Sequence, residues 1–343
     1  MFLAALLDEW RYFTLNVRWN GTASRMVSSS VVLPSSEPIP ILWENLLDDE
    51  EPPALRYICE CEATDSRHQA ACLPSCLCTD CSTSSACACL GRRSAAYDES
   101  GRLRCLVDPA AADEDASVVI ECTSACACWP NCSNSVVSRG LTTPLQVFKT
   151  LNRGWAVRTL SSLPIGAFVC EYAGELISSE QTRRRLKRRR AEAAEAETCR
   201  GGGAYVKNYV MTVREHLISG RVLRTTIDPT EVGNVARFIN HACRPNLVQH
   251  LVRVGSLVPR VALFACREIA SGEELTMYYG DYHVAAASSE PPPSRTSGGP
   301  CGGPAVGMTA GMTRCLCGEV CCRGFLPFDS DATIDDEDHA DEP

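Results

Sequence analysis

Residues 237–246 carry side chains that suit chemistry better than packing. Within four residues they hold the amide of Asn240, the imidazole of His241 and the thiol of Cys243, and Pro245 follows. Buried polar groups cost free energy unless each finds a partner, so a core segment has no use for this cluster. The segment is therefore either a binding or catalytic site or a loop with a buried cysteine. Taken alone, it leaves both interpretations open.

Thirteen of the 22 cysteines lie between positions 59 and 132, and nine of these form two blocks with close, repeated spacing. Three ions that share three bridging thiolates need twelve bonds, which three bridging and six terminal cysteines supply. The spacing therefore predicts a cluster of three Zn²⁺ ions, with unrelated or disulfide-bonded cysteines as the alternative. The predicted ligands are Cys76, Cys78, Cys81, Cys87, Cys89, Cys122, Cys126, Cys128 and Cys132. Outside the pattern lie Cys72, Cys105 and the pair Cys59 and Cys61, which is a weaker alternative as first ligand pair.

Three further cysteines near the C-terminus are one ligand short of a tetrahedral zinc site. They are Cys315, Cys317 and Cys322. We expect Cys243 to supply the fourth thiolate, because that bond would fasten the tail over residues 237–246. The alternative is a self-contained site that uses Cys321 or Cys301.

The composition favours metal-bound thiolates over disulfides. The apolar run at residues 1–7 has no basic leader and is too short for an export signal or a membrane span. We therefore expect reduced thiols in a cytosolic or nuclear compartment. The 343 residues carry a net charge of -9, which argues against a general nucleic-acid binder held by phosphate contacts. An acidic surface instead suits a basic partner.

These groups must be positioned by a mainly β domain that begins near residue 141. One helix is expected from residue 178 or 179 to about residue 197, before three glycines that stop it. Its residues 183–190 include seven cations, which are either a solvated face or a nucleic-acid contact or import signal. Short β-branched and aromatic runs predict strands over residues 145–149, 155–159, 168–177, 209–213, 261–269 and 274–279.

Composition shifts divide the chain into six parts. Residues 1–58 are an N-terminal extension that either packs on the core or has no fold of its own. Residues 285–312 are rich in Ala, Ser, Pro and Gly and read as a flexible linker. The other parts are the cysteine-cluster region 59–140, the β domain 141–284, the C-terminal cysteine site 313–329 and an acidic tail 330–343.

Together these segments resemble the SET-domain protein lysine methyltransferases, over about residues 70–328. The cysteine blocks are similar to the nine-cysteine pre-SET region, and the C-terminal cysteines to the post-SET region. The resemblance implies a mainly β SET-domain fold with short helices and a pseudo-knotted crossing of residues 237–246. A zinc-cluster pre-SET region and a zinc-bound post-SET tail would flank that domain. The SET motifs are matched by residues 153–157, 171–175, 237–246 and 274–280.

The resemblance also implies S-adenosylmethionine as the cofactor and a histone tail as the substrate, in the nucleus and on chromatin. Histone H3 is expected, at a lysine near the globular end of its tail, with no membrane contact and no strong direct DNA binding. Tyr209 and Tyr279 would flank the methyl-transfer channel, where the Tyr279 hydroxyl would orient the amine. By position, the cofactor-binding residues would be Arg153, Gly154, Trp155, Tyr209, Arg237, Asn240 and His241.

Three positions depart from the family pattern. Ala156 stands where the family usually has glycine, Met277 where it has phenylalanine or tyrosine, and Tyr278 where it often has aspartate. Methionine has no O–H donor and a flexible side chain, so we expect methylation beyond the monomethyl state. The alternatives are a catalytically inactive, zinc-stabilised chromatin-binding module, which Ala156 and Met277 would support, and a methyltransferase of non-histone proteins.

Overall fold

The structure is a computed structural model, and it describes the core of the chain with several gaps. The predicted linker 285–312, with Cys301, and the acidic tail 330–343 lie outside the described residues. No helix in the described part is long and apolar enough to cross a membrane. The described residues are 31–32, 35, 37–64, 72–79, 81, 87–91, 95–108, 118–200, 208–217, 219–280 and 313–327.

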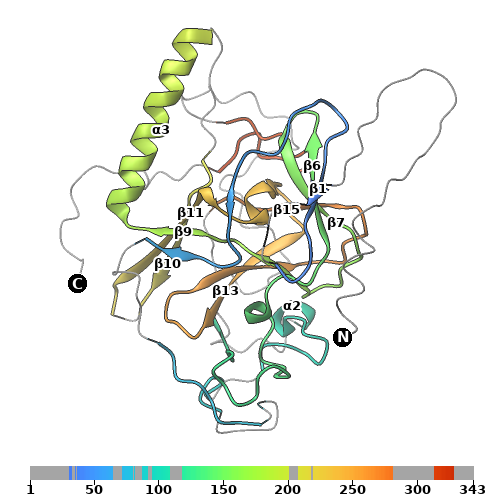
Figure 1. The fold of residues 1–343 in the computed structure, drawn as a ribbon, viewed down its shortest axis with the longest axis vertical. Helices are drawn as coiled ribbons and strands as arrows, with labels where there is room; N and C mark the ends of the chain where they lie inside the picture. Colours follow the sequence, from blue (N-terminus) through green and yellow to red (C-terminus); the bar gives the residue numbers. More distant parts are fainter. Residues whose placement is uncertain are drawn as a thin grey trace, which may run out of the picture.

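The predicted mainly β fold is confirmed, since three sheets form the body of the protein (Figure 1). Two α-helices are described, the short α2 (Arg104–Val107) and the long α3 (Ser179–Arg200). The first sheet has the strand order β1 (Val31–Val32), β2 (Leu42–Glu44), β6 (Leu145–Thr150), β7 (Gly154–Thr159), β15 (Glu274–Met277) and β12 (Asn240–His241).

The other two sheets share the chain segment around residues 168–177. One has the order β10 (Met211–His216), β11 (Val222–Gly233), β9 (Gly174–Ile177) and β4 (Glu62–Ala63), with β3 (Arg56–Tyr57) also paired to β11. The other has the order β5 (Val118–Glu121), β13 (Leu247–Val254), β14 (Arg260–Ala265) and β8 (Phe168–Glu171). Two 3₁₀ turns, η4 (Val137–Arg139) and η5 (Val235–Phe238), lie beside β8.

The single strand expected at 168–177 is in fact two strands, β8 and β9, in different sheets. The chain changes sheet at Tyr172 and Ala173, where the side chain of Asn234 holds it. The Asn234 amide donates to the carbonyl oxygen of Glu171 (2.7 Å) and accepts from the backbone N–H of Ala173 (3.4 Å). A side chain some sixty residues away therefore breaks a pattern that reads locally as one strand.

Two long strands, β11 and β13, were not predicted. The β11 sequence contains Pro229 and several polar residues, which argue against a central strand. It is nevertheless buried from Thr225 to Pro229, because β9 and β10 cover it from both sides. The other predicted strands are present, with ends that shift by up to four residues.

The N-terminal extension packs on the core in its described part. Strand β2 pairs in parallel with β6, and the side chain of Ile41 is fully buried. The rings of Trp43 and Trp155 meet edge to face with centroids 5.9 Å apart. These contacts place β2 beside β6 and bring Trp43 against Trp155 of β7, which is one of the expected cofactor residues.

Helix α3 begins where the sequence predicts, and Ser178 caps it. The Ser178 hydroxyl accepts from the backbone N–H of Gln181 (3.2 Å), and the Gln181 side chain accepts from the backbone N–H of Ser178 (2.9 Å). This reciprocal arrangement satisfies two backbone donors at the start of the helix. Its far end passes the expected residue 197 and reaches Arg200.

We expect Gly174→Ala to destabilise the fold strongly. A Cβ atom at Gly174 would lie 2.7 Å from the backbone nitrogen of Pro229 and 2.8 Å from the carbonyl carbon of Asp228, neither of which can move freely. The free energy of unfolding, measured by urea denaturation, should fall by about 3 kcal/mol.

The matched control is Gly272→Ala. A Cβ atom there meets nothing within 4 Å, so only its φ of +82° opposes the change. That variant should lose about 1 kcal/mol. Equal losses in the two variants would show that β9 does not pack on β11 this closely.

Candidate functional site

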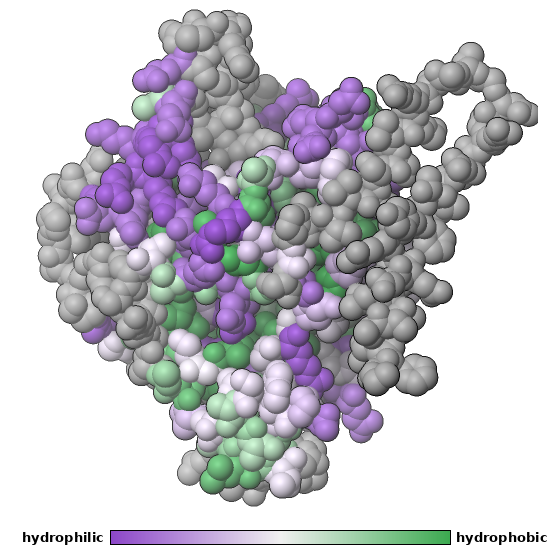
Figure 2. Space-filling view, in the orientation of Figure 1, coloured by the Kyte–Doolittle hydropathy of each residue, from purple (hydrophilic) through white to green (hydrophobic). Residues whose placement is uncertain are grey.

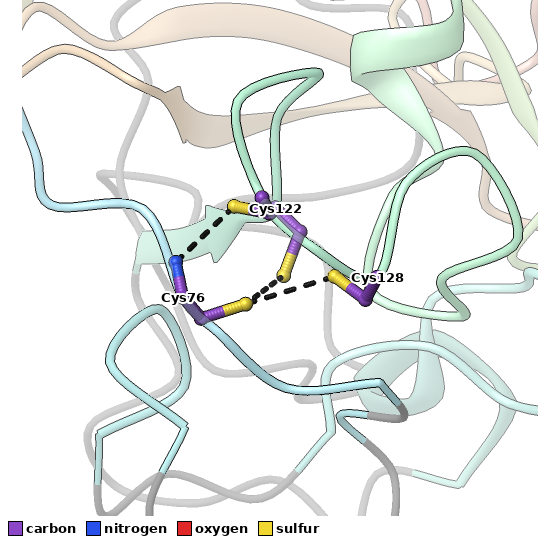
Figure 3. A group of neighbouring side chains, drawn as sticks. Cys76, Cys122 and Cys128 are labelled. Atoms are coloured by element: carbon purple, nitrogen blue, oxygen red, sulfur yellow. Dashed lines mark hydrogen bonds between the residues drawn. The ribbon is translucent and has the colours of Figure 1, made fainter.

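All nine cysteines predicted for the first metal site lie together. Cys76, from the first block, and Cys122 and Cys128, from the second, point toward one another in Figure 3. Sγ of Cys76 lies 3.8 Å from that of Cys122 and 3.6 Å from that of Cys128. Disulfide sulfurs are about 2.05 Å apart, whereas a tetrahedral Zn²⁺ with bonds of about 2.3 Å holds its sulfur ligands about 3.8 Å apart. The spacing therefore fits shared metal ligands.

The nine thiols form overlapping groups, as a cluster with bridging ligands requires. In each of four groups of four, the sulfurs lie within 4.8 Å of one another. Cys76 and Cys122 each belong to three of these groups, so they are central to the cluster. The groups are Cys76, Cys122, Cys126 and Cys128; Cys76, Cys87, Cys89 and Cys122; Cys76, Cys78, Cys81 and Cys87; and Cys81, Cys122, Cys128 and Cys132.

The electrostatics of these thiols fit bound cations. Burial raises the pKa values of the Cys81 and Cys122 thiols, because it disfavours the charged thiolate. Burial also acts on Cys126, but backbone N–H groups of Thr123 and Cys76 each donate to its Sγ at 3.4 Å and lower its pKa to about 7. Several buried thiolates in one place are favourable only beside cations, so the cluster could bind zinc.

The second predicted site also forms, and Cys243 completes it. The sulfurs of Cys243, Cys315, Cys317 and Cys322 all lie within 4.8 Å of one another. Backbone N–H groups of Arg323 and Gly324 donate to Sγ of Cys243 and of Cys322, both at 3.4 Å. Cys321 is exposed and lies outside the group, so the described residues favour Cys243 over Cys321 as the fourth ligand.

Residues 237–246 and 274–280 lie side by side, as the expected crossing requires. Strands β12 and β15 pair in parallel, with Asn240 opposite Thr276 and His241 opposite Met277. The side chain of Asn246 fastens the same two segments. It donates to the carbonyl oxygen of Glu274 (2.8 Å) and accepts from the backbone N–H of Thr276 (2.8 Å).

The expected cofactor residues of β7 and β12 meet around Glu274. The Asn240 amide donates to the carbonyl oxygen of Trp155 (3.3 Å) and to the Glu274 carboxylate (3.2 Å). The Arg153 guanidinium forms an ion pair with the same carboxylate at 2.5 Å. Between Arg153 and Trp155, Gly154 adopts a φ of 72°, which turns the chain at the start of β7.

His241 lies between the crossing and the tail site. Its Nδ1 accepts from the backbone N–H of Tyr279 (3.2 Å), and its Nε2 lies 3.5 Å from Sγ of Cys243. Burial, and then the nearby Arg323 cation, lower its pKa to about 4. The imidazole is therefore neutral at physiological pH, with its proton on Nε2 and facing the Cys243 sulfur.

Tyrosines converge beside this crossing. The Tyr279 hydroxyl donates to the carbonyl oxygen of Ile239 (2.8 Å), and the Tyr172 hydroxyl donates to the carbonyl oxygen of Tyr209 (2.6 Å). Burial and then the neighbouring Tyr279 and Tyr209 raise the pKa of Tyr172. Tyr172 was not predicted as a site residue, although it lies in the motif 171–175, where its hydroxyl was the available signal.

Two buried side chains at the site have unsatisfied donors. Arg237 stacks its guanidinium on the Tyr209 ring at 4.6 Å, yet its Nε and Nη1 have no hydrogen-bond partner among the described residues. The same holds for Nε1 of the buried Trp155. Such groups are costly unless a ligand supplies acceptors. Their position beside the other expected residues fits a polar cofactor such as S-adenosylmethionine.

The three residues that depart from the family pattern are each buried or in contact with another side chain. Ala156 is completely buried in β7, so protein already covers its methyl group. Met277 is buried, with its Sδ 3.9 Å from the amide nitrogen of Gln249. The Tyr278 hydroxyl accepts from Arg323 of the tail (2.9 Å), and the Arg323 guanidinium lies over the Tyr278 ring at 5.4 Å.

Comparisons with known proteins agree with this arrangement. The SET domain family model matches residues 154–280, and the Pre-SET motif model matches residues 34–135. Histone-lysine N-methyltransferase SETMAR of Mus musculus is 38% identical over 259 residues, which are 75% of this chain and 74% of that protein. SETMAR of Homo sapiens is also 38% identical, but the match covers only 34% of its length.

Solved structures show the same likeness. The methyltransferase domain of human SETMAR matches with a TM-score of 0.63 and 30% identity, over 85% of this chain and 96% of that one. Arabidopsis thaliana SUVH6 in complex with SAM matches with a TM-score of 0.59 and 28% identity, over 85% of this chain and 54% of that one.

A third solved structure is KRYPTONITE in complex with mCHH DNA, an H3(1-15) peptide and SAH. It matches with a TM-score of 0.59 and 27% identity, over 85% of this chain and 52% of that one.

Similarity to the methyltransferase half of SETMAR is predicted by residues 209–220, 227–230, 258–265 and 325–330, and the comparisons confirm that similarity. The crossing, the tyrosines beside it, the nine-cysteine cluster and Cys243 of the tail site lie within the matched residues. The chain therefore belongs to the SET-domain histone-lysine N-methyltransferases.

Proposed function

We propose that this chain transfers the methyl group of S-adenosylmethionine to a lysine of a histone tail, on chromatin in the nucleus. The main support is the meeting of Tyr172, Tyr209 and Tyr279 beside Asn240 and His241. The relatives are histone-lysine N-methyltransferases, and one similar structure holds an H3 peptide. We propose histone H3 as the substrate, at a lysine near the globular end of its tail.

The main barrier is the charge of the substrate lysine. With a reference pKa of about 10.4, about one lysine in 10³ is neutral at physiological pH, which is a deficit of about 4 kcal/mol. A narrow channel lined by tyrosine rings reduces this deficit, because desolvation disfavours the ammonium form. The bound cofactor supplies the sulfonium methyl group, and the proton leaves to water.

The hydroxyls leave acceptors for the amine. The Tyr279 O–H already donates to Ile239, so its oxygen lone pairs remain to accept from the lysine nitrogen. The Tyr172 O–H is likewise committed to the carbonyl oxygen of Tyr209. Fixed acceptors of this kind align the nitrogen with the methyl group and require no reorganisation during the reaction.

An inactive chromatin-binding module would share the fold. Ala156 supports that alternative only if its methyl group crowds the cofactor, and its burial inside β7 argues against this. Incubation with labelled S-adenosylmethionine and core histones tests the proposal. Label on H3 supports it. Label that appears only when other proteins are supplied as substrates favours a non-histone substrate, and no label with either kind of substrate favours the inactive module.

We expect about four zinc ions per chain, three shared in the cluster and one in the tail site. Mass spectrometry of the purified metalloprotein measures this number, and a count of one or none would contradict the ligand assignment. Chelation should unfold the cysteine-cluster region as well as abolish activity, because its buried core consists largely of the nine thiols.

A matched pair of variants isolates the tail site. Cys322→Ser should lose one zinc ion and methyl transfer while keeping the SET fold, because the tail is no longer held to Cys243. Cys321→Ser changes an exposed neighbour outside the group and should keep both zinc and activity. Normal activity of Cys322→Ser would refute the role of the shared site.

We expect Tyr279→Phe to lower kcat by about 10²-fold, because one preorganised hydrogen-bonding group near the reacting nitrogen is lost. Single-turnover kinetics with a histone peptide measure the effect, and the affinity for S-adenosylmethionine should change little. Tyr278→Phe is the control, since its hydroxyl accepts from Arg323 of the tail. It should cost much less, and equal losses would argue against a special role for Tyr279.

Met277 should permit products beyond monomethyl-lysine. In the family, a tyrosine at this position can hold a water in the space that a further methyl needs, whereas methionine has no O–H donor. Met277→Tyr would also bring a hydroxyl close to the Gln249 amide, which now lies 3.9 Å from the methionine sulfur. That partner would help to fix the hydroxyl and its water.

Mass spectrometry of a methylated histone peptide tests this prediction under excess cofactor. The wild type should reach the dimethyl or trimethyl state, and Met277→Tyr should stop earlier with a smaller loss of total turnover. Met277→Phe is the control and should keep the higher product. A wild-type product that stops at one methyl group would show that this position does not set the count.

A further inference from the structure

The outer face of α3 carries a strip of cations that the proposed reaction does not use. Arg184, Lys187 and Arg190 follow one another at spacings of three residues and are exposed. Side chains three residues apart lie next to each other on a helix, so the three charges form one row about 9 Å long. Figure 2 shows hydrophilic residues gathered over this helix, and Figure 1 shows its far half extending beyond the sheets.

The opposite face of α3 fixes the helix to the sheet. Arg185 forms ion pairs with Glu175 (2.7 Å) and with the fully buried Asp228 (2.8 Å). Arg189 binds the same Asp228 carboxylate at 2.8 Å. Leu186, which lies between the two arginines in the sequence, is buried. The basic run therefore divides into an anchored inner face and an outer face turned to solvent.

The outer cations are not neutralised within the described structure. Arg188 has Glu192 and Glu231 at 3.5 and 3.4 Å, but Arg184, Lys187 and Arg190 form no ion pair with any described residue. Like charges three or four residues apart destabilise a helix by about 0.2–0.5 kcal/mol per pair. The row thus carries a stability cost that an external polyanion would remove.

We propose that the outer face of α3 docks the phosphate backbone of duplex DNA. One strand of a duplex presents a phosphate for about every 3.4 Å of axial rise, and its successive phosphates lie farther apart than this because the strand winds around the axis. Three long side chains spread over about 9 Å can therefore contact up to about three phosphates. Arginine and lysine side chains bind phosphate well, and contacts to phosphate oxygens carry no sequence information. The contact is therefore independent of sequence.

An acidic receptor that binds the run as an extended peptide fits less well. Such binding would have to unwind residues 183–190 and break the ion pairs of Arg185 and Arg189 with Asp228. A duplex instead accepts the helix as it stands. The net charge of -9 argues against general nucleic-acid binding but opposes a local contact only weakly, because charges beyond about 10 Å are screened at physiological salt.

The first experiment measures DNA binding directly and needs no enzyme activity. Fluorescence anisotropy with a 20-base-pair duplex should give a slope of log K against log salt of about -2.7, or about 40-fold weaker binding at 200 mM than at 50 mM salt. The triple variant Arg184→Gln, Lys187→Gln and Arg190→Gln should reduce that slope by about 2 or more. Glutamine is a good helix former, so the helix should be kept, and circular dichroism checks this.

The matched control removes three positive charges elsewhere. Arg56→Gln, Arg102→Gln and Arg267→Gln change arginines that each pair with a carboxylate, at 2.5, 2.8 and 2.5 Å. This variant has the same net charge as the α3 variant and should bind DNA like the wild type. Equal losses in both triple variants would show that total charge, and not α3, governs binding.

The second experiment rests on the proposed methyltransferase function. The α3 variant should methylate nucleosomes at least about 10-fold more slowly than the wild type, because the DNA contact is lost, but should methylate a free histone tail peptide equally. If neither substrate is methylated by the wild type, the proposed function fails while the anisotropy result still decides the DNA contact.

Two outcomes would overturn the DNA proposal. One is a wild-type protein that does not bind the duplex at 50 mM salt. The other is an α3 variant that binds the duplex and methylates nucleosomes normally but no longer accumulates in nuclei, which would assign the row to an acidic import receptor.

Discussion

The site depends on one short parallel pairing, between β12 and β15. Parallel strands need a long connection, and here the chain makes β13 and β14 before it returns to lie beside Asn240 and His241. With so few residues paired, the backbone alone holds the segments weakly. The side chain of Asn246 adds bonds to Glu274 and Thr276, and the sulfur of Cys243 adds the tail. The side chains of Asn246 and Cys243 thus each fasten a different segment to the same crossing.

The cysteine ligands could be predicted because their spacing along the chain is visible in the sequence, even though each site combines cysteines from separate segments. The close spacing of cysteines in two blocks, residues 76–89 and 122–132, identified all nine thiols of the cluster, and the missing fourth ligand of the tail pointed to Cys243. The expected cofactor residues followed from the resemblance, and the structure brings Arg153, Trp155 and Asn240 together around Glu274. Glu274 was predicted only as part of the motif at residues 274–280. The sequence of a strand does not show which distant residues an acidic side chain will contact.

What the sequence did not predict comes from contacts between distant segments. The break between β8 and β9 depends on Asn234, and the burial of β11 depends on strands from both sides. Tyr172 became a candidate site residue only because its hydroxyl reaches the carbonyl oxygen of Tyr209, which is 37 residues further along the chain. Strand propensity and hydrophobic periodicity depend on residues that are neighbours along the chain, so they do not predict contacts between distant segments.

The departure at Tyr278 shows how such a meeting can compensate for a change in a motif. Aspartate, common at this place in the family, would offer Arg323 a carboxylate, whereas Tyr278 offers it a hydroxyl acceptor at 2.9 Å and an aromatic face at 5.4 Å. The guanidinium therefore stays beside the crossing, and the backbone N–H of the same residue donates to Cys243. Its positive charge also helps to keep His241 neutral, so that the imidazole can accept from the backbone of Tyr279. One residue of the tail thus connects the C-terminal cysteine group, the imidazole and Tyr279, and a change at position 278 is tolerated because the cation keeps an attractive partner.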